Sequence, residues 1–346
     1  MATVTIPSCG AQFDCSPKQS LLDAALEAGA AIPHNCRSGS CGECKARVID
    51  GETVDGDFYP YALDEAEIAA GYRLLCCVRP GSDHIAVEPT EAMMAAGQDQ
   101  ASVPRSYDCK VVQHMPVTPS ILQLTLELPQ DAGFRFRPGM YAELHMPGKT
   151  DASRPYSIAT APDAVGAPLN RQLTFHVARH PQGRVSPALH DNLAVGDTLR
   201  IHGPYGGFRL PEGDGPLLML GGGTGLAPLL SLAASRTGAR DIVLILSVRD
   251  RSEVFALDML QAIAKRNPLF RYLVTLTREE TGSTVEFLSG RIPLWLTQQV
   301  TDCNRREAFV TGPPDFVDAC CRALRAAGLP DRLIQQDKFE ARTVPA

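Results

Sequence analysis

Four cysteines place the tightest constraint on how this chain folds. Cys36, Cys41 and Cys44 lie within one stretch of nine residues, and Cys76 follows after a gap of thirty-one residues. Four thiolates can surround one inorganic group if a single loop curls around it with three of them and a distant segment supplies the fourth. Glycines inside the loop allow this tight curl. The sequence therefore predicts a metal-binding loop near the N-terminus.

The spacing C-x4-C-x2-C with a distant fourth cysteine is typical of a [2Fe–2S] cluster. Gly39 and Gly42 would let backbone N–H groups approach the sulfurs. A structural zinc site is the alternative, but such sites usually contain two C-x2-C pairs and this chain has one. Cys77 competes with Cys76 as fourth ligand. We favour Cys76, because adjacent side chains on an extended segment point in opposite directions.

The other cysteines are not expected to form disulfides. The chain has 11 cysteines in 346 residues, and an odd number speaks against a fully paired set. The N-terminus lacks the basic segment and apolar run of a signal peptide, and no apolar stretch is long enough to cross a membrane. We therefore expect a cytoplasmic protein, where disulfides are rare. The scattered cysteines are expected to be small buried residues: Cys9, Cys15, Cys109, Cys303, Cys320 and Cys321.

Negative charge is concentrated in the first quarter of the chain. Residues 1–90 contain six Lys or Arg and thirteen Asp or Glu, a net charge of −7, whereas the whole chain has −6. An acidic surface suits docking on a basic protein partner and disfavours binding to nucleic acid. Ordinary solubility is the alternative explanation, and charge alone does not separate the two.

Three sections can be distinguished along the chain. Residues 1–90 hold the clustered cysteines, and the small or polar residues 91–106 are expected to form a linker. Residues 107–210 contain short alternating runs, such as Leu122–Leu128, that predict an antiparallel β-barrel. Residues 211–346 alternate strand-like and helical stretches, which predicts a doubly wound parallel sheet. The expected fold is therefore multidomain, combining α+β and α/β parts.

Individual elements follow from the same patterns. Ser20 is expected to cap a helix over 21–28 that ends at Gly29, and a return strand is expected to start at Val48. Strands are expected over 121–128, 141–146, 172–178 and 198–202, then over 217–220, 242–248, 272–276 and 308–311, with helices over 227–235, 255–265 and 316–327.

The cysteine spacing resembles the plant-type ferredoxin domain, a β-grasp fold, as found in reductases of bacterial aromatic-ring oxygenases. In the second section, Arg154-Pro-Tyr156-Ser157 resembles the R-x-Y-S motif of the ferredoxin–NADP reductase superfamily. The resemblance implies that Arg154 meets the flavin pyrophosphate, that Tyr156 packs on the isoalloxazine and that Ser157 lies near flavin N5. These roles suit a forked guanidinium, an aromatic ring and a hydroxyl.

Further motifs appear in the order typical of this superfamily. The segment 136–139 resembles its F-x-P-G turn, and 203–206 resembles its closing G-P-x-G. A second phosphate-contacting segment is matched by Gly183, Arg184, Val185 and Ser186. His176 and Val177 are also assigned to cofactor binding. Because an N-terminal ferredoxin goes with FAD in this family, the flavin is expected to be FAD. Phe339 resembles the terminal aromatic residue that covers the other flavin face, although seven residues follow it here.

A glycine-rich turn follows the apolar run at 217–220. Such a turn lets backbone N–H groups approach a pyrophosphate at a helix N-terminus. It is neither a Walker A loop nor G-x-G-x-x-G, but its form G-G-x-T-G-x-A-P resembles the reductase superfamily. The expected coenzyme-binding residues are Gly222, Gly223, Thr224 and Gly225.

Two other segments are assigned to the coenzyme site. Thr311-Gly312-Pro313 resembles the superfamily's C-G-P motif, with threonine in place of the cysteine near the nicotinamide. Arg249 and Asp250 end the second apolar strand, where the adenosine ribose would lie. An acid there fits a free 2′-hydroxyl and an arginine fits a 2′-phosphate, and we favour NADH over NADPH. The candidate catalytic residues are Ser157, Thr311 and Phe339.

The resemblance covers nearly the whole chain and implies an electron-transfer reductase. A hydride would pass from NADH to FAD, and single electrons would leave through the [2Fe–2S] cluster for a terminal oxygenase docked on the acidic ferredoxin domain. The expected partner is a Rieske-type aromatic-ring-hydroxylating enzyme of aromatic hydrocarbon catabolism. The alternatives are a deoxysugar-forming dehydratase or a diiron monooxygenase as acceptor and, without electron relay, a zinc-stabilised flavoprotein or binding module. Neither nucleic acid nor a membrane is expected as a partner.

Overall fold

A computed structural model describes the chain except for residues 31, 33, 38, 40, 60–61, 91–103, 150–151, 162–170, 207, 209–212, 236–238, 280–286 and 340–346. It divides into two compact units. Unit 1 comprises Met1–Arg105 with Pro204–Gly207, and unit 2 comprises Ser106–Gly203 with Phe208–Ala346. Most of the expected linker over 91–106 lies outside the described residues.

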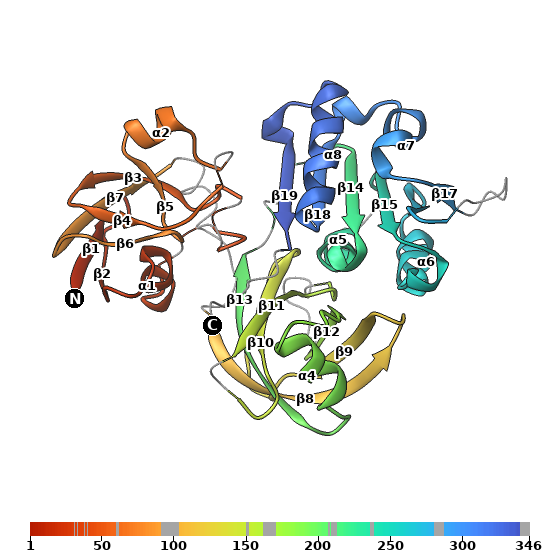
Figure 1. Cartoon of the computed structure of the whole chain (residues 1–346), viewed down its shortest axis with the longest axis horizontal. Coiled ribbons are helices and arrows are strands. Elements are labelled where there is room, and N and C mark those ends of the chain that lie inside the picture. The colour runs from red at the N-terminus through yellow and green to blue at the C-terminus, as the bar shows by residue number, and fades with distance from the viewer. Residues whose placement is uncertain are drawn as a thin grey trace. The chain divides into compact units, whose positions relative to one another are not determined.

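Unit 1 is built on a mixed sheet with the strand order β2-β1-β7-β3-β5 (Figure 1). β1 runs parallel to β7, and the other pairs are antiparallel. A separate two-stranded ribbon joins β4 to β6. The strands are β1 (Ala2–Ile6), β2 (Ala11–Cys15), β3 (Lys45–Asp50), β4 (Thr53–Asp55), β5 (Tyr72–Leu74), β6 (Val78–Pro80) and β7 (His84–Pro89), with helices α1 (Leu21–Glu27) and α2 (Glu65–Ala69).

Helix α1 leads into the cysteine loop and confirms the expected capping. The Ser20 hydroxyl accepts a hydrogen bond from the Asp23 N–H at 3.0 Å, which satisfies one of the unpaired donors at the helix start. Gly29 has φ +78° and ends the helix in the left-handed region, where a side chain would be strained. The return strand β3 begins at Lys45, three residues before the expected Val48.

Unit 2 contains an antiparallel six-stranded sheet with the order β11-β10-β13-β8-β9-β12. A single bridge between Ile158 and Phe175 connects the two ends of this order, so the sheet is a nearly closed barrel. Its interior is filled by alternating residues such as Leu122, Leu124 and Leu126. The elements are β8 (Arg105–Pro116), β9 (Ile121–Glu127), β10 (Met140–His145), β11 (Ser153–Ser157), β12 (Gln172–Ala178), α4 (Val185–Asp191) and β13 (Thr198–Gly206).

The second sheet of unit 2 is entirely parallel and has the order β17-β16-β15-β14-β18-β19. The chain order reverses between β14 and β18, which makes this the switch point where ligands bind in such folds. The elements are β14 (Leu217–Gly222), α5 (Leu226–Ser235), β15 (Ile242–Val248), α6 (Leu257–Arg266), β16 (Phe270–Leu276), β17 (Leu288–Ser289), α7 (Ile292–Gln299), β18 (Glu307–Gly312), α8 (Pro314–Ala326) and β19 (Ile334–Lys338), with short 3-10 helices η1 (Gly223–Gly225), η2 (Arg251–Glu253), η3 (Cys303–Arg305) and η4 (Asp331–Leu333).

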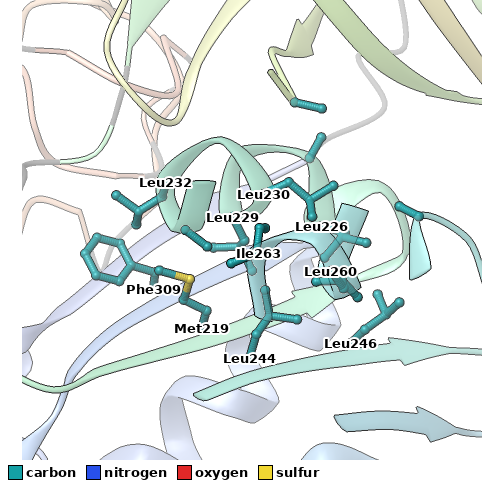
Figure 2. Packing of buried hydrophobic residues seen from close by; sticks show 14 of the residues in the cluster. Met219, Leu226, Leu229, Leu230, Leu232, Leu244, Leu246, Leu260, Ile263 and Phe309 are labelled. Atoms are coloured by element: carbon teal, nitrogen blue, oxygen red, sulfur yellow. The ribbon is translucent and has the colours of Figure 1, made fainter. Parts of the chain in front are cut away.

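Helices cover both faces of the parallel sheet, as a doubly wound fold requires. α7 and α8 pack on one face, against Val243 and Val310 among others. Figure 2 shows the core on the opposite face, where leucines of α5 and residues of α6 meet the strands. Ile121 and Ala159 of the barrel belong to the same core. Each buried leucine contributes about 2 kcal/mol, so this shared core holds the barrel and the parallel sheet together.

The scattered cysteines are buried at five of the six positions, and Cys9 is exposed, so the expectation was wrong for Cys9. Cys9 lies in the turn between β1 and β2, where residues 7–10 are all exposed. Within the described residues, none of the helices combines the length and apolar character that crossing a membrane requires.

Candidate functional site

The four predicted cysteine ligands stand as two pairs in unit 1. The Cys41 N–H donates to Cys36 Sγ at 3.3 Å, and the Cys36 N–H donates to Cys41 Sγ at 3.5 Å. Cys44 and Cys76 form the second pair, since the interaction between their thiols raises the pKa of Cys44 and lowers that of Cys76. No group of three or more His, Cys, Asp or Glu side chains is placed to hold one metal ion within the described part of the chain. Two thiol pairs match a two-iron cluster, because each iron takes two terminal thiolates.

Electrostatics at this loop favour a thiolate at Cys76. Hydrogen bonds from Cys44 and then from Cys77 lower the pKa of Cys76 to about 4. Hydrogen bonding to the partner thiol, followed by burial, raises the pKa values of Cys41 and Cys44. Metal ligation needs thiolates, so binding a cluster would release the remaining protons. The donor set therefore fits a [2Fe–2S] group.

The reason for choosing Cys76 over Cys77 was wrong. The two residues lie in the turn between β5 and β6, not on an extended segment, and their Sγ atoms are 3.5 Å apart. A turn can bring neighbouring side chains together, whereas a strand separates them. What distinguishes Cys76 is the interaction of its thiol with that of Cys44, which lowers the pKa of Cys76. Cys77 instead faces Gly39, where an added Cβ would lie 2.7 Å from the Cys77 sulfur.

Arg37 anchors the cysteine loop from a strained backbone position. Its φ of +52° is unusual for a residue with a side chain. The guanidinium donates to Asp23 of α1 at 2.6 Å, and its Cζ lies 4.1 Å from the ring centroid of Tyr205. Both residues belong to unit 1. The closing G-P-x-G motif thus contributes Tyr205 to the surroundings of the cysteine loop, a contact that the sequence did not predict.

The R-x-Y-S residues lie on β11, at one end of the barrel's strand order. Arg154 and Tyr156 share one face of this strand, because side chains alternate along it. The Arg154 guanidinium donates to the Ser153 carbonyl at 2.7 Å. Burial raises the pKa of Tyr156, so its hydroxyl stays protonated. Ser157 is 9% exposed. A guanidinium, an aromatic ring and a hydroxyl together fit the chemistry of a flavin dinucleotide.

The other predicted flavin residues lie beside β11. The Ile158–Phe175 bridge brings β12, with His176 and Val177, against the end of β11. The segment from Gly183 to Ser186 leads into α4, and the Ser186 hydroxyl accepts the His180 N–H at 3.0 Å. The side chains of Val177 and Val185 belong to the barrel core, so they offer only backbone groups to a cofactor. Arg184 is exposed.

His176 faces the parallel sheet across the core of unit 2. Its ring lies 4.9 Å from that of Phe255 in an edge-to-face arrangement, and Nε2 is 3.4 Å from Gln123 Oε1. Burial lowers the pKa of His176 to about 4, so the ring is neutral. Nδ1 is buried with no partner among the described residues. A ring nitrogen left in this state is one that a cofactor hydroxyl would satisfy.

The glycine turn and the Thr311 segment meet at the switch point of the parallel sheet. Gly221 pairs with Thr311 across β14 and β18. The Thr311 hydroxyl donates to the Gly225 carbonyl. A Cβ on Gly225 would lie 2.3 Å from the Thr311 carbonyl oxygen, and one on Gly312 would lie 2.9 Å from the Gly222 oxygen. The two backbones therefore pack directly against each other.

The outer side of the same turn is open. Gly223 has φ +54°, and a Cβ added there would meet nothing within 4 Å. Thr224 follows it in η1, and α5 begins directly afterwards. Gly223 thus has a left-handed backbone with free space beside it, just before the ten-residue helix α5. This arrangement fits a pyrophosphate. The site residues thus fit a dinucleotide coenzyme.

Four further predicted residues reach the same edge of the sheet. The Phe339 N–H donates to the Gly312 carbonyl at 2.8 Å, which places Phe339 beside the Thr311 segment. Pro313 occupies the N-cap position of α8. Arg249 and Asp250 follow β15, which pairs with β14 up to the Gly222–Ser247 position. The Asp250 carboxylate accepts the Ser252 N–H at 3.0 Å and is fixed by it.

A second carboxylate in this segment was missed by the sequence reasoning. Glu253 ends η2 and accepts hydrogen bonds from the hydroxyls of Thr118, at 2.9 Å, and Ser120, at 2.6 Å. These two residues precede β9 of the barrel. No sequence motif marks Glu253, because its partners are more than 130 residues away.

Comparison with protein families divides the chain in three. Residues 4–81 match the 2Fe-2S iron-sulfur cluster binding domain. Residues 108–210 match the oxidoreductase FAD-binding domain, and residues 219–322 match the oxidoreductase NAD-binding domain. These ranges contain, respectively, the cysteine pairs, the barrel and the glycine turn.

Similar proteins extend over almost the whole chain. The reductase component of propane 2-monooxygenase from Rhodococcus jostii is 31% identical over 95% of this chain and 88% of its own length. The electron transfer component of toluate 1,2-dioxygenase from Pseudomonas putida is 29% identical, covering 95% of each chain. The crystal structure of a cytochrome P450 reductase from Amycolatopsis is 31% identical and superposes with a TM-score of 0.82, covering 98% of this chain and 99% of that one.

Proposed function

Because the chain belongs to the family of oxygenase reductase components, with 2Fe-2S, FAD-binding and NAD-binding domains, we propose that it delivers electrons to the terminal component of an oxygenase. The chain is an electron-transfer oxidoreductase. When bound, the flavin turns the hydride of the reduced coenzyme into single electrons that the cluster relays. The observation that carries the proposal is the pairing of Cys36 with Cys41 and of Cys44 with Cys76 in a chain that also has the glycine turn.

The residues of the parallel sheet would hold the coenzyme at its carboxyl edge. The N–H groups of Gly223 to Gly225, at the start of a helix, would donate hydrogen bonds to the pyrophosphate, and the backbone of Gly312 packs closely against that of Gly222. Phe339 stands beside Gly312 and would exclude water from the nicotinamide end. Arg154 would hold the flavin phosphates through its guanidinium, and Tyr156 would offer its ring face.

The coenzyme is proposed to be NADH. The Asp250 carboxylate is held by Ser252 at the end of β15, where it can accept hydrogen bonds from a ribose 2′-hydroxyl. Arg251, the residue after Asp250, pairs with an acid: its Nε donates to Glu279 Oε1 at 2.6 Å. The Asp250 carboxylate would repel the 2′-phosphate of NADPH. Arg251 is already paired with Glu279 and would not attract that phosphate.

Docking of the partner is proposed to use the acidic segment Asp50–Asp57 of unit 1. The segment is mostly exposed and adjoins the cysteine loop, since the Gly56 N–H donates to the Cys77 carbonyl at 2.8 Å and the Tyr59 N–H donates to the Gly39 carbonyl at 3.1 Å. A basic partner face would be drawn to this segment and brought near the cluster ligands.

Reconstitution tests the proposal. The purified chain is mixed with NADH and, in turn, with a Rieske dioxygenase, a diiron monooxygenase and a haem monooxygenase, and substrate oxidation is measured. We expect substrate oxidation with one of the three enzymes, and the sequence predicts the Rieske dioxygenase. The rate of substrate oxidation should fall as the salt concentration rises. Turnover with none of them, while cytochrome c is still reduced, would contradict the oxygenase assignment and leave the reductase activity in place.

A further inference from the structure

We propose that Glu253 is a positioning residue for hydride transfer, acting through a bridge of Glu253, Thr118 and Ser120 that fixes the coenzyme-binding edge of the parallel sheet to the flavin barrel. The inference rests on the proposed function. The two cofactors of that function would bind to different parts of unit 2, one to the barrel and one to the parallel sheet. Hydride transfer requires the reacting atoms to lie roughly 3–3.5 Å apart. Whatever holds the two parts in register therefore controls the rate.

The hydroxyl groups of Thr118 and Ser120 both donate to the Glu253 carboxylate. The Thr118 hydroxyl oxygen accepts the backbone N–H groups of Ile121, at 2.9 Å, and Ser120, at 3.2 Å. Its own proton is then directed at Glu253, 2.9 Å away. The Ser120 hydroxyl donates to the same carboxylate oxygen at 2.6 Å. Hydrogen bonds to a charged acceptor are about twice as strong as neutral ones.

Glu253 belongs to the same short segment as Asp250, which is proposed to bind the coenzyme ribose. Glu253 lies three residues after Asp250 in the short helix η2, whose first turn Asp250 caps. On the other side of Glu253, Phe255 packs edge-on against His176 of β12. The segment thus touches the barrel through a polar contact and an aromatic contact within three residues. A shift of Glu253 would carry Asp250 with it.

Backbone strain at the end of this segment supports the same role. Ala256 has φ +55°, a left-handed conformation that is strained for a residue with a side chain. Such a conformation persists only where the surroundings determine it. Both neighbours of Ala256 constrain its backbone, because Phe255 packs against His176 of the barrel and Leu257 begins α6. The segment is therefore held in one arrangement.

Stopped-flow reduction of the holoprotein by NADH without oxygen measures the effect. We expect Glu253→Ala to slow flavin reduction by roughly tenfold to a hundredfold, the effect of an ångström-scale displacement, with normal FAD content and coenzyme affinity within about threefold of the wild type. Glu253→Gln retains an acceptor oxygen and should recover most of the rate. Asp108→Ala is the matched control, since Asp108 also accepts two hydrogen bonds, at 2.8 and 2.9 Å from Arg200, but both residues lie in the barrel.

A second variant and a second readout keep the test decisive. Ser120→Ala removes one donor from the barrel side, and the double variant with Glu253→Ala should be no slower than Glu253→Ala alone, because both changes break one contact. Hydrogen exchange in the cofactor-free chain should become faster over residues 117–121 and 250–256 in Glu253→Ala. Wild-type reduction rates in Glu253→Ala, additive effects in the double variant, or unchanged exchange would each overturn the proposal. Failure of the wild-type flavin to be reduced by either coenzyme would instead refute the proposed function.

Discussion

The Thr311 hydroxyl donates a hydrogen bond to the Gly225 carbonyl and joins the end of β18 to the glycine turn after β14. Both residues are buried, Thr311 with no exposed surface. In the resembling reductases a cysteine holds the position of Thr311, and a thiol is a weaker donor than a hydroxyl. Thr311 thus ties the two backbone segments of the coenzyme site together, and its proton is already committed to the protein.

Gly225→Ala is expected to disrupt the coenzyme site. The added Cβ would lie 2.3 Å from the Thr311 carbonyl oxygen and 2.9 Å from the Gly312 Cα, and backbone on both sides cannot move aside easily. We expect a loss of about 1–3 kcal/mol in unfolding free energy and a weakening of NADH binding by roughly tenfold or more. Thermal unfolding and coenzyme titration measure the two effects.

Gly215→Ala provides the matched control, because a Cβ there would meet nothing within 4 Å and no left-handed φ is involved. It should bind NADH as the wild type does. Equal behaviour of the Gly225 and Gly215 variants would show that the close approach of Thr311 is not needed.

Arg154→Ala is expected to lose FAD. The guanidinium is held by the Ser153 carbonyl on β11 and would supply charged hydrogen bonds to the phosphates, each worth about 1.5–3 kcal/mol. We therefore expect retention of FAD through gel filtration to fall by roughly tenfold or more. Arg171→Ala, which removes an exposed pair with Glu127 on the same barrel, should keep its flavin. Full flavin content in Arg154→Ala would remove this assignment.

NADH is expected to be oxidised with the higher kcat/KM. Replacing the acid at the ribose position, Asp250→Ser, should lower the NADH preference by roughly tenfold, about 1.4 kcal/mol of discrimination. Arg249→Ser should lower the residual activity with NADPH. Steady-state kinetics with both coenzymes decides the matter, and a wild type that prefers NADPH would mean that Arg249 outweighs Asp250.

Acidification below pH 6.5 is expected to destabilise unit 2 through His176. Burial lowers the pKa of His176 from 6.5 to about 4, so the folded ring stays neutral while the unfolded ring takes up a proton between these values. Stability contributed by this group is therefore complete above pH 6.5 and declines as the pH falls towards 4, by about 3 kcal/mol at most. Unfolding midpoints at pH 7 and pH 5 should differ less in His176→Asn than in the wild type. An identical pH dependence in both would contradict this account.

Much of the fold was predictable because its elements are locally encoded. The predicted strands over 172–178 and 242–248 match β12 and β15 residue for residue. In β12 the side chains alternate between the barrel core and the other face, and in β15 every residue is buried, so each has a clear periodicity. Helix α6 begins at Leu257, two residues later than expected, because Phe255 packs against His176 of the barrel and Ala256 has a left-handed backbone that cannot continue the helix.

The parts of the site that sequence did not predict depend on long-range contacts. The Cys76–Cys77 turn has no local signature, since both flanking strands are three residues long. Glu253 meets Thr118 and Ser120 only after the barrel and the parallel sheet have packed. The position of Tyr205 beside Arg37 is likewise a tertiary result. Motifs identify residues that touch cofactors, whereas residues that hold those residues in place carry no comparable pattern.

Cys41→Ser is expected to separate the two halves of the electron path. Loss of one thiolate from the Cys36–Cys41 pair should remove the cluster, with iron and acid-labile sulfide falling together. NADH should still reduce the flavin, but reduction of one-electron protein acceptors should stop. Cys9→Ser, at an exposed cysteine outside the loop, is the control and should keep both activities. Equal loss of both activities in Cys41→Ser would contradict the order of the relay.

Low-temperature electron paramagnetic resonance of the intact protein, recorded after NADH is added without oxygen, tests the relay most directly. We predict the signal of a singly reduced two-iron centre in the wild type and its loss in Cys41→Ser. A wild-type flavin that bleaches on addition of NADH while no such iron signal appears would contradict the relay.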